Sequence, residues 1–325
     1  MSHEITIRED GKAEMAFRAG TDFPWHFSDT NPAQVPVDAT IAQWVEAAGM
    51  EWTVEAARVQ FEAGGALREY DDRVVLHRSD TLAPLGVVSD DYNIIQPAEC
   101  IGFFDDLVQS VGMTLDTAGT LFGGRRFWAL AKIGEDCIID NRDPIKGYLL
   151  LTSSADGLRA TQARFTSVRV VCQNTLSLSE SKDGKSEIKI THRSQWNPEG
   201  VKKQLGVAPK TFDQFMTNMR RLADYRLDDD QAQFQVKKLL GKEAMEEGKP
   251  GKTFTRVMDL FRGIATGANE PGFAGTAWGL LNSTTEALDH GSRAKSDSHR
   301  LYSALMGPGE KTKSKMRDQL LALVS

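Results

Sequence analysis

Apolar and polar residues alternate with a period of two through the middle of the chain, the pattern of strands with one buried face. The clearest example is the pair of segments 113–122 and 125–133, which flank Gly123-Gly124. Consecutive glycines suit a tight hairpin loop because both positions can take positive φ. Further β-rich stretches lie at 145–153, 160–172 and 187–192. The pattern predicts an antiparallel sheet over this part of the chain.

The residues before this sheet predict a mixture of helices and short strands. Asp38 is placed to cap a helix that runs to about Ala48, where Gly49 ends it. A strand over 52–59 should follow, and then two short β-rich runs that read as a hairpin around Asp71-Asp72. Another short strand is expected at 86–89, and Pro97 should open a helix. Residues 1–36 lack periodicity, so we expect an N-terminal arm.

From Pro198 the apolar period changes to that of an α-helix. Helices are expected at about 210–222, 229–240, 254–264, 276–288, 298–306 and 311–324. Strands followed by helices, rather than an alternation of the two, are typical of an α+β fold. We therefore predict an N-terminal arm over 1–36, a sheet-rich α+β domain with packed helices over 37–195, and a mainly helical C-terminal region over 196–325.

Composition places the chain among ordinary globular proteins, with 40% hydrophobic and 26% charged residues. The longest apolar runs are too short to cross a bilayer, and the polar N-terminus does not resemble a signal peptide. The three cysteines (Cys100, Cys137 and Cys172) show no CxxC spacing, so we expect reduced thiols rather than disulfides or a zinc site. These features predict a cytoplasmic protein without a membrane span.

The net charge of −6 conceals an asymmetry. The first 120 residues carry 21 Asp or Glu against 7 Lys or Arg, whereas residues 121–194 carry 8 against 12. A basic segment of this kind suits nucleic-acid binding, although basic residues on solvated strands that pair with the acidic third would look the same. An acidic part and a basic part within one chain also suit head-to-tail contacts between copies, which form rings or filaments.

No familiar catalytic motif is present. The chain has no phosphate-binding loop, dinucleotide fingerprint, nucleophile elbow or HExxH helix, so we expect no cofactor and no catalytic residues. The six histidines are scattered, which leaves no metal site to predict. Acidic doublets and the triplet 228–230 have a sufficient explanation in turns and helix starts. A metal-dependent nuclease remains as an alternative to a non-enzymatic protein.

Arginines and glycines of the central segment are the best candidates for a binding surface. Arg125 and Arg126 follow the Gly123-Gly124 turn directly, where glycines allow close approach to a phosphate and arginines bind it in a bidentate manner. Phe127 and Trp128 come next and offer faces for stacking on bases. An ordinary hairpin whose alternate residues face water is the competing interpretation. The remaining candidates for a nucleic-acid path are Arg159, Arg164, Arg169, Lys185, Lys189 and Arg193.

Three segments resemble a known family. They are AGTLFGGRRFWALAKI at 118–133, LLTSSADGLRATQARFTSVRVVCQNTL at 150–176 and GTAWGLLNSTTEALDH at 275–290. They look like those of phage- and plasmid-related proteins that carry domain of unknown function 932. The resemblance implies a role in replication, recombination or host conflict.

A looser resemblance concerns single-strand annealing proteins of the Redβ, Erf and RecT kind. Their β-β-β-α core is comparable to the strands expected between Trp52 and Ser89 and the helix at Pro97. This resemblance implies a protein that binds single-stranded DNA, assembles into homo-oligomeric rings or filaments and needs no ATP. We therefore expect strand annealing in recombination or replication. A non-enzymatic interaction or regulatory protein that acts on host or phage proteins is the alternative.

Overall fold

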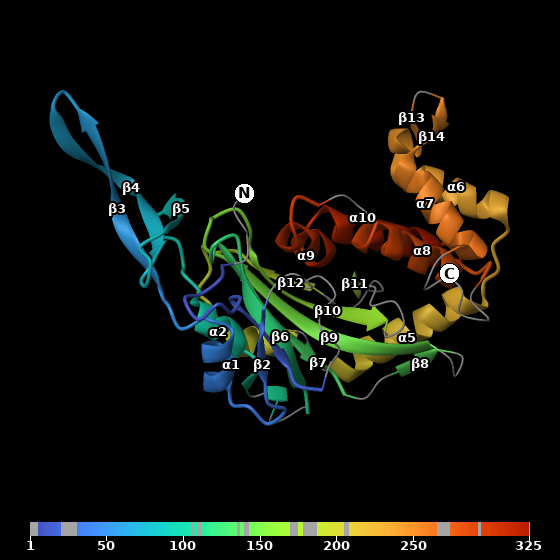
Figure 1. The fold of residues 1–325 in the computed structure, drawn as a ribbon, viewed down its shortest axis with the longest axis horizontal. Coiled ribbons are helices and arrows are strands. Elements are labelled where there is room, and N and C mark those ends of the chain that lie inside the picture. Colours follow the sequence, from blue (N-terminus) through green and yellow to red (C-terminus); the bar gives the residue numbers. More distant parts are fainter. Residues whose placement is uncertain are drawn as a thin grey trace. The chain divides into compact units, whose positions relative to one another are not determined.

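The computed structural model describes residues 6–20, 31–105, 107–108, 112–134, 137–139, 143–169, 175–177, 187–204, 208–246, 248–264, 274–291 and 294–324 (Figure 1). The strands of the sheet-rich part are β1 (Met15–Arg18), β2 (Ala33–Val35), β3 (Val54–Ala63), β4 (Ala66–Arg78), β5 (Pro84–Ser89), β6 (Thr114–Leu121), β7 (Arg126–Lys132), β8 (Cys137–Ile139), β9 (Asp143–Ser154), β10 (Thr161–Arg169), β11 (Thr175–Ser177) and β12 (Glu187–Ile190). Helices α1 (Ile41–Ala47) and α2 (Pro97–Gly102) lie among them.

The C-terminal part is mainly helical, as the change of period predicted. Its elements are α4 (Pro198–Gln204), α5 (Ala208–Asp224), α6 (Asp229–Leu240), η2 (Gly241–Ala244), β13 (Met245–Glu246), β14 (Lys249–Pro250), α7 (Lys252–Asp259), η3 (Leu260–Ile264), α8 (Ala277–Asp289), α9 (Asp297–Leu305) and α10 (Pro308–Leu321). The α+β fold class is therefore confirmed. None of the helices in the described ranges is long and apolar enough to span a bilayer.

The chain divides into two compact units that are not contiguous in sequence. Unit 1 comprises residues 1–134, 149–164 and 187–206, and unit 2 comprises 135–148, 165–186 and 207–325. Strands β9 and β10 contribute residues to both units, so the chain passes from one to the other within them. Residues 1–36, expected to form an arm, supply two strands of unit 1, because β1 pairs with β2 and with β6.

Unit 1 contains two sheets. The larger has the strand order β2-β1-β6-β7-β9-β10, with β12 also paired to β10. Helix α2 packs against β7, and α1 packs against β1 and β2. The expected hairpin at Gly123-Gly124 is present between β6 and β7, where both glycines have positive φ. The smaller sheet has the order β3-β4-β5, and α2 follows it, so the expected β-β-β-α order is observed.

Two local predictions in unit 1 were wrong. Thr40, not Asp38, caps α1, because the Thr40 side chain accepts from Gln43 N and the Gln43 side chain accepts from Thr40 N in a capping box. The hairpin loop between β3 and β4 is Gly64-Gly65 rather than Asp71-Asp72. The acidic pair instead lies in a bulge of β4, because Val59 pairs with Tyr70 while Arg58 pairs with Val74.

Unit 2 is organised around α8, which contacts α5, α7, α9 and α10. Nearly every side chain of α8 is buried, including the polar ones. Ser283, Thr284 and Thr285 donate from their hydroxyls to the carbonyls four residues earlier, at 2.8 to 2.9 Å, so their burial leaves no donor unpaired. Lys313 of α10 donates to both carboxylate oxygens of Asp289 at 2.7 and 3.0 Å, and both side chains are 1% exposed.

A buried ion pair connects the two sheets of unit 1. Arg78 of β4 donates to both carboxylate oxygens of Glu14 at 2.6 and 3.0 Å, and the two side chains are 4% and 3% exposed. Thr120 of β6 also donates to Glu14, and the Arg78 guanidinium lies 4.1 Å from the centre of the Trp52 ring. Burial disfavours the charge on Arg78, but its hydrogen bonds to Asp80 and Glu14 outweigh burial and raise its pKa.

Replacing Arg78 with methionine should leave Glu14 buried without its cation. Because an uncompensated buried charge is costly, we expect the free energy of unfolding to fall by about 3–5 kcal/mol. Urea denaturation followed by circular dichroism measures the change. Glu14→Gln in the same chain should recover part of the loss. Arg68→Met, on the exposed part of β4, is the control and should change stability by about 0.5 kcal/mol or less. Equal effects of the two arginine substitutions would show that the ion pair is not structural.

Candidate functional site

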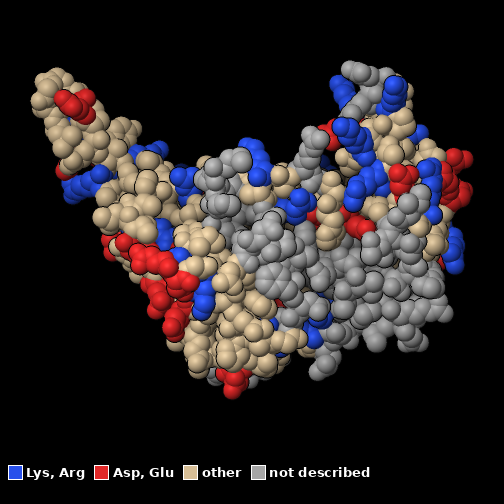
Figure 2. Space-filling view, viewed as in Figure 1, with Lys and Arg blue, Asp and Glu red and all other residues tan. Residues whose placement is uncertain are grey.

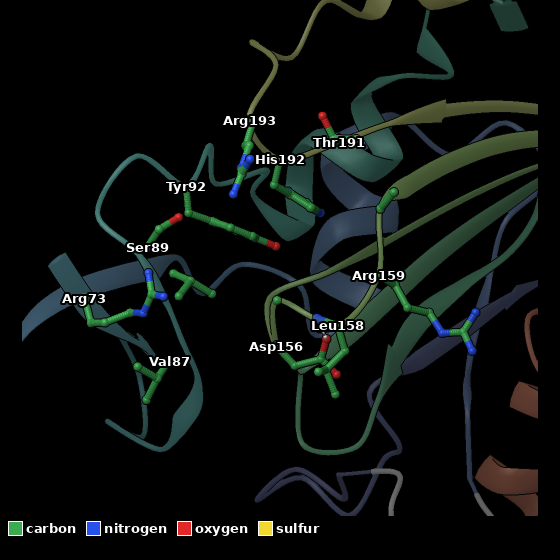
Figure 3. A pocket seen from close by; sticks show the side chains of 13 residues that line it. Arg73, Val87, Ser89, Tyr92, Asp156, Leu158, Arg159, Thr191, His192 and Arg193 are labelled. Atoms are coloured by element: carbon green, nitrogen blue, oxygen red, sulfur yellow. Dashed lines mark hydrogen bonds between the residues drawn. The ribbon is translucent and has the colours of Figure 1, made fainter.

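An open pocket of about 800 Å³ in unit 1 is lined by residues of four segments (Figure 3). Arg73 comes from β4, the residues 87–89 from β5, and the residues 156–160 from the connection between β9 and β10. Tyr92 follows β5, and the residues 191–193 follow β12. Three arginines, Arg73, Arg159 and Arg193, therefore meet around one hollow although more than 100 residues separate the first from the last.

Tyr92 and His192 form the aromatic wall of the pocket. Their rings are stacked with centroids 4.3 Å apart and an interplanar angle of 13°. The Tyr92 hydroxyl donates to the Ser154 carbonyl at 2.8 Å, and burial raises the pKa of Tyr92. Asn93 holds His192 in place, since its backbone N–H donates to the His192 carbonyl at 2.7 Å and its carbonyl accepts from Nδ1 of His192 at 3.0 Å. Hydrogen bonds in both directions thus hold the segment after β5 against the segment after β12.

The surroundings of His192 favour its neutral form. Burial lowers its pKa, and the backbone carbonyls of Asn93 and Arg159 and the charge of Asp156 only partly oppose this shift. Because Nδ1 must carry the proton that it donates to the Asn93 carbonyl, Nε2 of the neutral ring has a lone pair. Nε2 is buried, makes no hydrogen bond of good geometry within the described residues, and the side chain as a whole is 9% exposed.

The carboxylate of Asp156 is neutralised within the pocket wall. Its Oδ2 accepts from Arg126 at 3.1 Å, its Oδ1 accepts from the Leu158 backbone N–H at 3.0 Å, and its side chain is 9% exposed. The lining thus has an excess of positive charge, with three arginines and one carboxylate that is already paired. Figure 3 shows Arg73 and Arg193 directed towards the space beside Tyr92, whereas the guanidinium of Arg159 points away from it.

Close packing between β5 and the Asp156-Gly157 turn fixes the pocket floor. A side chain on Gly86 would place its Cβ 2.8 Å from the Asp156 backbone, and one on Gly157 would meet Val88 at 2.9 Å. Gly157 also has a φ of +71°, which other residues rarely adopt. The pair Asp156-Gly157 therefore has a structural role. It packs the loop that carries Leu158 and Arg159 against the small sheet.

The predicted nucleic-acid residues divide into four groups. Arg159 and Arg193 line the pocket. Arg125 is exposed and lies beside the pocket, because its carbonyl accepts from the backbone N–H of Ala155 at 2.8 Å and Ala155 precedes the pocket residue Asp156. Lys189 is exposed on β12, paired with Gln162 of β10. Arg164 is buried at 5% exposure, and Arg126 is held by Asp156. Lys185 and the side chain of Arg169 lie outside the described part of the chain.

The structure corrects the assignment of two aromatic residues and of one glycine. Phe127 and Trp128 are 0% and 1% exposed, so their rings are not available for stacking on bases. Strand β7 is buried on both faces, which is why alternate residues do not face water. Gly124 is buried against Trp52, where an added Cβ would lie 2.7 Å from the ring, so its role is in packing rather than in approach to a phosphate. Gly123 remains exposed in the turn.

Three residues of the pocket were missed in the sequence: Arg73, Tyr92 and His192. Arg73 lies in the acidic first third, and His192 was read as one of six scattered histidines. The triplet Thr191-His192-Arg193 directly after a strand was the available signal. In the described part of the chain, no group of three or more His, Cys, Asp or Glu side chains is arranged to hold a metal ion.

The lowered pKa of His192 predicts a pH dependence of stability. The unfolded imidazole takes up a proton near pH 6.5, whereas the folded one does so only at lower pH. The unfolded state therefore binds more protons below this pH, and stability should fall as pH falls through 6.5. We expect His192→Gln to weaken this dependence, as measured by urea midpoints on either side of pH 6.5. His77→Gln, in the small sheet, is the control. An unchanged pH dependence in His192→Gln would contradict the assignment of a neutral, buried ring.

Comparison with known proteins identifies a family but no activity. A family model described as "Domain of unknown function (DUF932)" matches residues 84–306. Neither the curated proteins nor the solved structures include one that matches the chain. The matched span takes in more than two thirds of the sequence and every pocket residue except Arg73. The chain therefore belongs to the family defined by the domain of unknown function DUF932.

Proposed function

We propose that this protein binds single-stranded DNA, with the arginine-lined pocket as a phosphate and nucleotide site, and that it promotes pairing of complementary strands without ATP. The observation that carries the proposal is that Arg73 and Arg193, from two distant segments, face one open pocket whose lining also includes Arg159. A role in recombination or replication of phages or plasmids follows from the family resemblance described above and is part of the proposal.

The charge of the pocket selects an anion. Arginine guanidinium groups bind phosphate oxygens in a bidentate manner, and such charge-assisted bonds are stronger than neutral ones. Asp156 does not cancel the attraction because Arg126 already neutralises it. Arg125, beside the pocket, and Lys189 on β12 are exposed and supply further contacts for a backbone that leads to and from the pocket. Phosphate contacts of this kind carry no information on base sequence, so we expect binding without sequence preference.

The other side chains of the pocket suit a nucleotide rather than a simple anion. A volume of about 800 Å³ lies within the range of pockets that enclose small organic ligands. Tyr92 supplies a ring whose one face is covered by His192, which leaves the other for a base. A single strand can turn one nucleotide into such a hollow, whereas a duplex keeps its bases stacked inside.

An interaction or regulatory protein is the second candidate, because one exposed element suits protein contacts. The paired parts of β3 and β4 next to their loop are exposed on both faces and carry the side chains of Phe61, Leu67 and Tyr70 at 44%, 67% and 50% exposure. Large exposed apolar side chains gathered on one element mark interaction sites. This element belongs to a different part of unit 1 from the pocket floor, so the two functions can be tested separately.

Removing the two arginines that face the pocket should weaken DNA binding. In Arg73→Ala with Arg193→Ala, two phosphate contacts are lost, so the slope of log affinity against log salt should fall by roughly 1.4 for a single strand. The measurement is fluorescence anisotropy of a labelled thymidine oligonucleotide over a range of salt concentrations, together with an annealing assay without ATP. The effect should be the same for oligonucleotides of unrelated sequence.

The control is Arg221→Ala with Lys238→Ala, which removes the same charge from exposed positions in unit 2 and should leave the slope unchanged. An equal loss of affinity in both double variants would mean that net charge, not the pocket, governs binding. If the wild-type protein binds no oligonucleotide at low salt, the DNA-binding function is wrong and the interaction protein takes its place.

A further inference from the structure

Strand β3 is an exposed edge strand of unusual length. It spans ten residues, Val54–Ala63, and within the described residues it pairs with β4 alone, in the sheet order β3-β4-β5. The side chains from Glu55 to Arg58 and at Gln60, Phe61 and Glu62 are exposed. No proline or lysine, the residues that commonly blunt an edge, interrupts β3. The backbone N–H and C=O of Val54 bond the Gln96 side chain. Beyond Val54, the outward backbone N–H and C=O groups of such an edge strand are a template for pairing with another chain.

The heptapeptide Ala57–Ala63 is complementary to itself when it runs antiparallel about Gln60. In that register Arg58 lies opposite Glu62 of the second copy, Val59 lies opposite Phe61, and Ala57 lies opposite Ala63. The Arg58–Glu62 pairs then join opposite charges, and the Val59–Phe61 and Ala57–Ala63 pairs join apolar residues. Directly opposite residues in antiparallel strands are the pairs that stabilise a sheet. The two-fold axis would pass through Gln60.

The charged pairs and the apolar pairs lie on opposite faces of the strand. Successive side chains of a strand point to opposite faces, so Arg58, Gln60 and Glu62 share one face and Ala57, Val59 and Phe61 share the other. Tyr70 of β4 pairs with Val59 and extends the apolar face. The extra residues of the bulge, 71–73, belong to β4, so β3 itself remains a continuous strand for pairing.

The charges along the outer part of the β3–β4 hairpin agree with this register. In the view of Figure 2 this part of the hairpin carries mostly uncharged residues, with acidic side chains near the loop and basic side chains closer to the rest of unit 1. On β3 itself, an antiparallel partner would bring its Glu62 to Arg58 of the first copy, whereas β4 carries charges of both signs along the hairpin. Arg58 is 77% exposed and binds Glu69 at 2.6 Å, and its five donors allow a second carboxylate.

We propose that two copies of this chain pair through the outer edges of β3, in the register centred on Gln60, to form one continuous sheet with the order β5-β4-β3-β3-β4-β5. The partner is a second copy because the strand complements itself in charge and in apolar pairs. A two-stranded ribbon is marginally stable alone, and the added strands would support it. This contact closes at two copies, unlike the head-to-tail contacts expected from the charge split. It does not depend on DNA binding.

Charge reversal tests the register. Arg58→Glu and Glu62→Arg each place like charges opposite one another twice per dimer, so each should weaken dimerisation roughly tenfold or more. The double variant Arg58→Glu with Glu62→Arg restores opposite signs and should return the dissociation constant to within roughly threefold of the wild-type value. A mixture of the two single variants should form a mixed dimer. Sedimentation velocity over a range of concentrations, without DNA, measures each species.

Cross-linking tests the position of the two-fold axis. Gln60→Cys places two thiols opposite each other in this register, so mild oxidation should trap a covalent dimer. Glu69→Cys, on β4 and away from the outer edge of β3, is the matched control and should yield little. Wild-type protein under the same oxidant controls for the native cysteines, of which Cys100 is buried.

Several outcomes would overturn the proposal. A wild-type protein that stays monomeric at high concentration excludes the contact, and so does a double variant no better than the single ones. A register centred closer to Val54 would pair Arg58 with Glu55 and would be insensitive to Glu62→Arg, so that result also excludes the proposed pairing. Loss of the dimer with oligonucleotide binding unchanged is the expected combination. Loss of DNA binding alone contradicts the proposed function and leaves this contact intact.

Discussion

The buried ion pair between Glu14 and Arg78 is the constraint on which unit 1 depends. It connects β4 of the small sheet to the segment that enters β1 of the large sheet, with Thr120 and Trp52 completing its surroundings. The pocket has walls from both sheets, since Arg73 lies on β4 whereas Asp156 and His192 follow strands of the large sheet. Neither Glu14 nor Arg78 lines the pocket, but their ion pair joins the two sheets that supply its walls. Gly124 must lack a side chain for the same reason, because an added Cβ would lie 2.7 Å from Trp52 and 3.1 Å from Arg78.

Local signals in the sequence predicted the elements whose cause is local. The alternation on either side of Gly123-Gly124 and the helical period beyond Pro198 both correspond to observed structure, because side-chain periodicity and positive φ are properties of short segments. The hairpin loop at Gly64-Gly65 has the same double-glycine signal but was assigned to Asp71-Asp72. Acidic pairs are common in both turns and bulges. Only the pairing of β4 with β3, which skips residues 71–73, distinguishes the two.

The candidate site was predicted less well because long-range contacts build it. Arg159 and Arg193 were found from charge alone, but the clamp between Asn93 and His192 joins residues 99 apart and leaves no trace in either segment. The prediction that Phe127 and Trp128 stack on bases was wrong for a related reason. Alternation of apolar and polar residues predicts an exposed face only for a strand that is covered on one face. Strand β7 lies between β6 and β9, and α2 packs against it. Whether a strand is central or peripheral is a property of the whole sheet.

Strand β4 connects the two proposed binding surfaces. Its first residues pair with the exposed part of β3, its bulge follows at 71–73, and Arg73 at the end of that bulge lines the pocket. Bulges bend a strand and change its twist, so the direction of the hairpin and the position of Arg73 are set by the same local geometry.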